Sequence, residues 1–294
     1  MSQLRRKIFR ATILALLSLL MTADGLFGQK YTADFLNNPA GLAQLSSPEM
    51  SLMHSSQFLD LLQANFINFV FPTKSGGTFG ISYFRVGVEN IPMTTKLDEN
   101  NRPVIEKYFQ DLEHAIFLSF ASKVRDNFFL GGNLKMLIQQ IADHSAVGFG
   151  FDIGALYRLS DKFSLGACIQ DATGTFLFWD TGSREMRNPN VLLGATFYQK
   201  VPLFTGEIRA SLGQAFRFEG KMPENTYSVG KIAGVDLSAG LEYEIFRTIS
   251  MRIGRERNHL TAGAGIKFSF FSIDYAFISY DLGNAHRISG NIFF

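Results

Sequence analysis

The 294-residue chain has one cysteine, eight prolines and one sustained apolar run. Cys168 alone cannot form an intrachain disulfide, which excludes a disulfide-stabilised scaffold. The low number of prolines is compatible with a chain made of strands, because proline interrupts the hydrogen-bond ladder between strands. The apolar run, at 11–21, has about eleven residues, fewer than the roughly 20 that a membrane-spanning helix needs. No segment therefore predicts such a helix.

Catalytic and metal-binding motifs are also missing. The five histidines are scattered singly without metal-ligand spacing, and there is no Gly-x-Ser-x-Gly, His-Glu-x-x-His or phosphate-binding glycine loop. We expect no catalytic residues, no metal, no cofactor and no enzymatic activity. The alternative is chemistry beside a hairpin turn, for which His144 and His259 are the candidates.

The amino terminus has the pattern of a signal peptide. Arg5, Arg6, Lys7 and Arg10 precede the short apolar run, and small residues that offer cleavage sites follow it, with Gly28 favoured and Ala23 the alternative. Removing 1–28 lowers Lys+Arg from 28 to 24 and Asp+Glu from 26 to 25, so the mature net charge is 24 − 25 = −1. We expect an exported protein without a basic surface for nucleic acid.

Apolar and polar residues alternate with period two along most of the chain after Pro48. Several alternating runs last nine to sixteen residues, longer than soluble strands, which average about five or six. The expected strands are 50–58, 63–72, 77–86, 112–124, 128–142, 145–160, 162–171, 190–200, 206–217, 235–246, 248–257, 259–270, 272–281 and 286–294.

The connections at one end of these strands are longer than those at the other end. The long ones, 87–111, 172–189 and 218–234, follow strands three, seven and nine, so all three leave the same end. Short turns at one end and longer loops at the other are typical of outer-membrane barrels. The chain also ends within an alternating strand on Phe294, as expected where the last strand pairs with the first and leaves no edge.

We therefore predict an all-β fold, a transmembrane antiparallel β-barrel of 14 strands with a short hatch-like segment before it. The expected division is a cleaved signal peptide at 1–28, the hatch-like segment at 29–47 and the barrel at 48–294. From its composition, 29–47 could lie in the lumen as a plug or outside it as a periplasmic tail.

Charged residues occupy the polar phase of the strands, and the cost of a charge facing lipid assigns that phase to the lumen. They either form an ion-pair network that fills the barrel or line a polar pathway. The residues in this candidate network are Glu113, Lys135, Asp152, Arg158, Glu207, Arg209, Glu242, Glu244, Arg252, Lys267, Asp274 and Arg287.

Two of the expected loops are unusually apolar. Exposed apolar patches mark interaction sites, although the same residues could instead pack as a cap at the membrane interface. The candidate docking residues are Ile91, Met93, Phe176, Phe178 and Trp179.

Two segments resemble a known family. Asn38, Pro39, Ala40 and Gly41, placed just before the first strand, resemble the signature of FadL-type hydrophobic-compound transporters and, more closely, the related PorV/PorQ family. The Ile-Asp-Tyr-Ala-Phe at 273–277 and the Leu-Gly-Asn-Ala-His-Arg-Ile-Ser at 282–289 are similar to the carboxy-terminal pattern of PorV/PorQ proteins. The resemblance implies a fourteen-stranded barrel whose hatch contains the Asn-Pro-Ala motif.

The same resemblance implies two functions and the location. We expect an outer-membrane protein of a diderm bacterium that acts as an accessory or docking barrel for protein secretion or surface attachment. The alternative is a passive conduit for hydrophobic small molecules. Expected partners are outer-membrane lipid, secretion-system or cargo proteins, and hydrophobic small molecules, but not nucleic acid.

Overall fold

The computed structural model describes residues 37–218, 227–229, 233–281 and 283–294. The expected signal peptide and residues 29–36 of the expected hatch lie outside the described residues. Within the described part of the chain, no helix is long and apolar enough to cross a membrane. Short 3-10 helices are found at η2 (Pro39–Gln44) and η3 (Leu203–Thr205).

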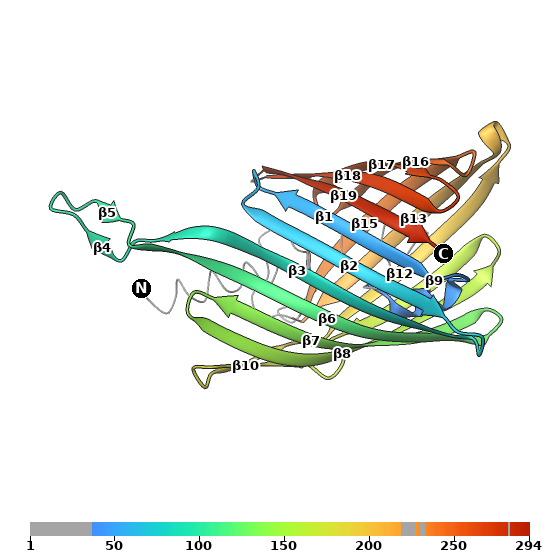
Figure 1. Ribbon diagram of the computed structural model, residues 1–294. Coiled ribbons are helices and arrows are strands. Elements are labelled where there is room, and N and C mark those ends of the chain that lie inside the picture. The colour runs from blue at the N-terminus through green and yellow to red at the C-terminus, as the bar shows by residue number, and fades with distance from the viewer. Residues whose placement is uncertain (1–36, 219–226, 230–232, 282) are drawn as a thin grey trace.

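Strands make up nearly all of the described chain (Figure 1). The first nine are β1 (Glu49–Gln57), β2 (Leu62–Pro72), β3 (Gly77–Met93), β4 (Lys96–Leu97), β5 (Pro103–Val104), β6 (Lys107–Arg125), β7 (Phe128–Ile141), β8 (His144–Ser160) and β9 (Phe163–Gln170). The others are β10 (Thr175–Trp179), β11 (Arg184–Arg187), β12 (Asn190–Val201), β13 (Gly206–Arg217), β14 (Tyr227–Val229), β15 (Ala233–Ile245), β16 (Ile249–Glu256), β17 (His259–Lys267), β18 (Phe271–Tyr280) and β19 (Gly283–Phe293).

Fourteen of these strands form one closed antiparallel wall. Neighbours in the wall follow chain order, and β19 then pairs with β1 from Glu49 opposite Phe293 to Gln57 opposite Ala285. Figure 1 shows these two strands, from opposite ends of the chain, side by side. The structure confirms the predicted 14-stranded barrel and the predicted closure by the last strand.

The two faces of the wall alternate as the sequence predicts. On β2, Phe66 and Asn68 are buried on the inside, whereas Ile67 and Phe69 are about 40% exposed on the outside. Every strand of an outer-membrane barrel needs this alternation, because lipid-facing and lumen-facing residues follow one another. The exposed apolar residues of neighbouring strands therefore form the lipid-facing surface.

Long and short connections lie at opposite ends of the barrel. At one end, β3 and β6 continue past their predicted limits and carry the β4–β5 hairpin beyond the barrel (Figure 1). The expected loop at 172–189 does connect two paired wall strands, β9 and β12, but it contains the strands β10 and β11, which pair with each other, and β10 also pairs with β8. Most of the expected 218–234 loop lies outside the described residues. Short turns join the strands at the other end, which we take as periplasmic.

The assignment of the outer face can be tested on β19. Ile288, midway along the strand, faces outward and is 58% exposed, whereas Asn284 faces outward close to the turn. We expect Ile288→Arg to lower the free energy of unfolding from lipid vesicles by about 2–4 kcal/mol and Asn284→Arg by about 0–1 kcal/mol, because a charge is costliest at the bilayer midplane. Guanidinium titration in vesicles measures both, and equal losses would refute the assignment.

Candidate functional site

The Asn-Pro-Ala motif lies at the start of η2, inside the barrel near its short-turn end. The Asn38 Oδ1 atom accepts a hydrogen bond from the Ala40 backbone N–H at 3.1 Å and so caps the helix. The Asn38 Nδ2 atom donates to the carbonyl oxygens of Ala155 and Ala167 at 2.9 and 3.3 Å. One side chain therefore both folds the turn and binds it to two adjacent wall strands, β8 and β9.

Glycines of the wall make room for this turn. An added Cβ at Gly131 would lie 2.5–2.6 Å from backbone atoms of Pro39 and Ala40, and one at Gly154 would lie 2.2 Å from the Asn38 Oδ1. Gly131 and Gly154 are directly opposite each other on β7 and β8. Such approaches are closer than any Cβ tolerates, so only glycine permits the motif to lie against the wall here.

Two further side chains join residues 38–44, the internal segment, to the barrel. Leu42 of η2 is 1% exposed and packs into the main apolar cluster of the lumen. The Arg158 guanidinium, at the short-turn end of β8, donates to the Gln44 Oε1 at 2.7 Å and lies over the Phe129 ring at 5.0 Å. The segment 38–44 is thus held by polar bonds, close backbone packing and an apolar contact.

Apolar side chains line one side of the lumen. The buried cluster includes Leu62 and Trp179, beside the turns at the long-loop end, and it continues through Phe117 to Leu42 of the internal segment. The other buried members are Ala64, Phe66, Val70, Phe84, Val86, Ala115, Ala121, Leu137, Ala146 and Leu177. All wall residues in this set come from β2, β3, β6, β7, β8 and β10.

Ion pairs cover the opposite side of the lumen. The Arg252 guanidinium lies 2.6 Å from the Glu242 carboxylate and 2.7 Å from that of Asp274, and Arg209 lies 3.0 Å from Glu242. Glu207 is 3.9 Å from Arg209. These residues belong to β13, β15, β16 and β18, so the ladder runs across neighbouring strands. It fills this side of the lumen with paired charges.

The other predicted network residues lie apart from this ladder. Glu113 pairs with Arg187 of β11 at 3.1 Å. The Lys267 ammonium lies over the Phe293 ring at 4.9 Å. Glu244 and Arg287 are buried on β15 and β19. The twelve predicted residues thus form several separate groups rather than one network.

A buried cluster on β7 and β8 contains residues that the sequence did not single out. The Lys135 ammonium lies 2.6 Å from the Asp152 carboxylate and 2.8 Å from that of Asp171, and Thr175 donates to Asp171. Asp171 belongs to the turn between β9 and β10, and its backbone N–H donates to Asp152 at 2.9 Å. The cluster therefore attaches this turn to the wall.

A second group is centred on Asp236, which alternation places on the inward phase, and contains two arginines that the sequence did not single out. The Asp236 Oδ2 atom accepts from Arg217 at 2.7 Å and from Arg257 at 2.6 Å. Arg257 belongs to the β16–β17 turn and Arg217 to the end of β13, where period two alone does not show that the two side chains converge. Among the described residues, no group of His, Cys, Asp or Glu is arranged to hold a metal ion.

The predicted docking residues do not share one loop surface. Trp179 was expected on an external loop, but it is 5% exposed and packs inside the lumen, because strand alternation in β10 turns it inward. Phe176 and Phe178 alternate with it and face outward, 46% and 50% exposed. Ile91 and Met93 lie on the projecting end of β3, opposite Phe109 and Lys107 of β6.

The buried Lys135 cluster generates a stability prediction. We expect Lys135→Met to lower the free energy of unfolding by about 3–5 kcal/mol, because it leaves two carboxylates buried without their cation. The triple variant Lys135→Met, Asp152→Asn, Asp171→Asn should recover most of that loss, because no buried charge remains. Guanidinium titration in vesicles compares the two, and a single variant as stable as the native protein would contradict this account.

In sequence, the chain matches no family model and no curated protein. In structure, it is similar to the Pseudomonas putida toluene transporter TodX, with 13% identity, 90% of this chain and 92% of that chain covered, and a TM-score of 0.61. It is also similar to the Ralstonia pickettii toluene transporter TbuX, with 12% identity, 88% and 92% coverage and a TM-score of 0.56.

A third similar structure is a Pseudomonas aeruginosa FadL homologue, with 13% identity, 92% and 95% coverage and a TM-score of 0.58. At these identities the similarity establishes the fold alone. The closed wall and the apolar outer face are those of a bacterial outer-membrane barrel. The chain thus has the fold of the FadL-type transporters of the outer membrane.

Proposed function

We propose that the protein is a gated conduit for hydrophobic small molecules across the outer membrane. The observation that supports this most directly is the apolar cluster in the lumen, which extends from Leu62 and Trp179 at the long-loop end to Leu42 of the internal segment. A hydrophobic molecule that moves along this side keeps apolar contacts, which favours its transfer out of water. The fold shared with toluene transporters is consistent with such a role.

The ion-paired side would then act as the rigid part of the lumen. Its carboxylates and guanidiniums satisfy one another across β13, β15, β16 and β18. Moving these charges apart would leave buried charges unpaired, which is strongly unfavourable. A route along the apolar side requires only the displacement of side chains held by packing.

The segment 38–44 would be the gate. It contacts β3, β6, β7 and β8 and carries Leu42, which is a buried member of the apolar cluster. Its attachment is local, since Asn38 makes two hydrogen bonds to wall carbonyls and Arg158 makes one to Gln44. Release of a few bonds would free the segment without breaking any wall ladder.

A second candidate is a docking barrel of the PorV/PorQ type, to which both ends of the sequence bear a resemblance. The exposed rings of Phe176 and Phe178 favour it, because they stand on the outer face at the long-loop end beside Arg184, whose guanidinium lies 5.7 Å from the Phe178 ring. Aromatic and arginine side chains are enriched at protein interfaces. In this case a secreted or secretion-system protein would bind there and no small-molecule route would be needed.

Trp179 provides a direct test of the conduit, because it is the chain's one tryptophan and belongs to the apolar cluster. We expect 1-bromooctane to quench its fluorescence saturably and toluene to compete. Leu62→Asn should weaken this quenching about tenfold, since a polar group placed in an apolar site costs about 1–3 kcal/mol. The matched control is Leu61→Asn, because Leu61 is 59% exposed in the adjacent turn. Non-saturable quenching, unaffected by either change, would refute the proposed route.

The gate is tested by two neighbouring glycines of β7. A Cβ at Gly131 would meet the backbone of Pro39 and Ala40, whereas one at Gly132 would meet the Phe151 ring on the outer face. In planar bilayers we expect the native protein and Gly132→Val to be silent and Gly131→Val to conduct, because valine displaces the internal segment. If Gly131→Val stays as silent as its control, the segment is not the gate. If 1-bromooctane also fails to quench the Trp179 fluorescence saturably, the docking function is favoured.

A further inference from the structure

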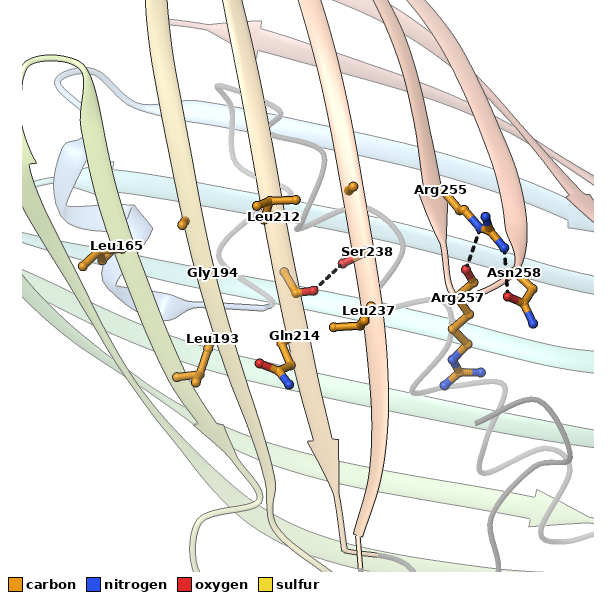
Figure 2. A pocket seen from close by; sticks show the side chains of 13 residues that line it. Leu165, Leu193, Gly194, Leu212, Gln214, Leu237, Ser238, Arg255, Arg257 and Asn258 are labelled. Carbon is orange, nitrogen blue, oxygen red and sulfur yellow. Dashed lines mark hydrogen bonds between the residues drawn. The ribbon is translucent and has the colours of Figure 1, made fainter. Parts of the chain in front are cut away.

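A groove of about 640 Å³ lies on the outer face of the barrel over β9, β12, β13, β15 and β16 (Figure 2). Its outward side chains form two rows. Leu165, Ala195, Leu212, Ala239 and Arg255 are directly opposite one another on five successive strands. Ala195 and Ala239 have short side chains and leave depressions on either side of Leu212, which is 65% exposed. The depression over Ala239, between Leu212 and Arg255, forms an apolar trough in the lipid-facing surface.

The second row lies beside the first and consists of Leu193, Gln214 and Leu237, again in direct register. Gln214 faces outward between two apolar residues of its own strand, Leu212 and Phe216. The Gln214 amide makes no hydrogen bond with another side chain or backbone group in the described part of the chain. An amide in an apolar setting needs a partner, since leaving it unsatisfied is unfavourable.

The first row crosses the membrane obliquely and ends on a positive charge. Leu165 lies two residues after the start of β9, at the short-turn end, whereas Arg255 lies next to the last residue of β16, at the long-loop end. Short turns are periplasmic and long loops external, so Arg255 lies at the outer leaflet. The groove therefore runs from within the membrane up to an arginine at its outer surface.

Arg255 is held in place but its charge is not neutralised by the described residues. Its Nε atom donates to the Arg257 carbonyl at 3.1 Å and its Nη2 atom donates to the Asn258 Oδ1 at 3.1 Å, as Figure 2 shows. Both acceptors are neutral, and no described carboxylate forms an ion pair with Arg255. Its register neighbours in the wall, Ala239 and Leu260, are apolar. A guanidinium with free donors suits a phosphate.

We propose that this groove binds a phosphorylated glycolipid of the outer leaflet. One acyl chain lies in the trough over Ala239, and a headgroup phosphate binds Arg255, which is directly opposite Ala239. The Gln214 amide hydrogen-bonds an ester, amide or hydroxyl group of the acyl linkage. Charge complementarity and the apolar trough select this partner over an uncharged lipid, and a groove of this volume is in the range of ligand sites.

Native mass spectrometry of the signal-free barrel in detergent tests the site with bisphosphorylated lipid A, its dephosphorylated form and phosphatidylglycerol. We expect one saturable lipid A site, with affinity lowered about tenfold by Arg255→Gln, since hydrogen bonds to charged groups are the strong ones. Ala239→Leu, which fills the trough without changing the charge, should lower affinity as well. Both changes face lipid and leave the wall ladders intact.

The matched control is Arg102→Gln, because Arg102 is exposed between β4 and β5 at the same end and lies outside the groove. It should bind lipid A like the native protein. The proposal is overturned if Arg255→Gln and Ala239→Leu bind like this control. It is equally overturned if the dephosphorylated form or phosphatidylglycerol binds as tightly as bisphosphorylated lipid A.

Discussion

Every backbone amide inside the bilayer must be hydrogen-bonded within the wall. The pairing of β1 with β19 meets this requirement for the two strands that would otherwise be edges of the sheet. Without that ladder, nine residues of Glu49–Gln57 would offer an unpaired edge to lipid, where no water can bond it. Because the barrel is closed, every strand has one face toward lipid and one toward the lumen, and its charged side chains must face the lumen. The separation of an apolar outside from a mixed inside follows from it.

Closure also determines what the lumen can contain. The inside of a fourteen-stranded wall is too wide to be filled by short side chains alone, and this chain uses two different fillings. Ion pairs bridge neighbouring strands on the β13–β18 side, and apolar side chains pack with η2 on the β2–β8 side. Because Leu42 is apolar and Asn38 needs only backbone carbonyls, the internal segment suits the second side.

Period two made the strands and the inward phase predictable, because both depend on local alternation, and closure followed from the requirement that a membrane-embedded sheet leave no edge. The same local evidence did not reveal the strands within 172–189, where the connection folds into the β10–β11 hairpin and β10 pairs with β8. Trp179 was misplaced for that reason. The role of Gly131 and Gly154 was equally hidden, since Gly131 faces the backbone of Pro39 and Ala40 and Gly154 faces the side chains of Asn38 and Pro39, far away in the sequence. Ion-pair partners such as Asp171 require the register, which alternation does not specify.

The order of residues along β7 and β8 limits where a hydrophobic route can run. Towards the long-loop end, the inward positions pass from Gly131 and Gly154 at the internal segment to Lys135 and Asp152 of the buried ion cluster. An apolar molecule on this path would have to cross paired charges before it reached the segment. On β2 and β3 the inward side chains are uncharged, and the cluster runs through Phe66 and Phe84, past the Asn68–Ser82 hydrogen bond, to Leu42. The path of lowest cost therefore follows β2 and β3, because β6 carries the buried Glu113–Arg187 ion pair and β7 and β8 carry the Lys135 cluster.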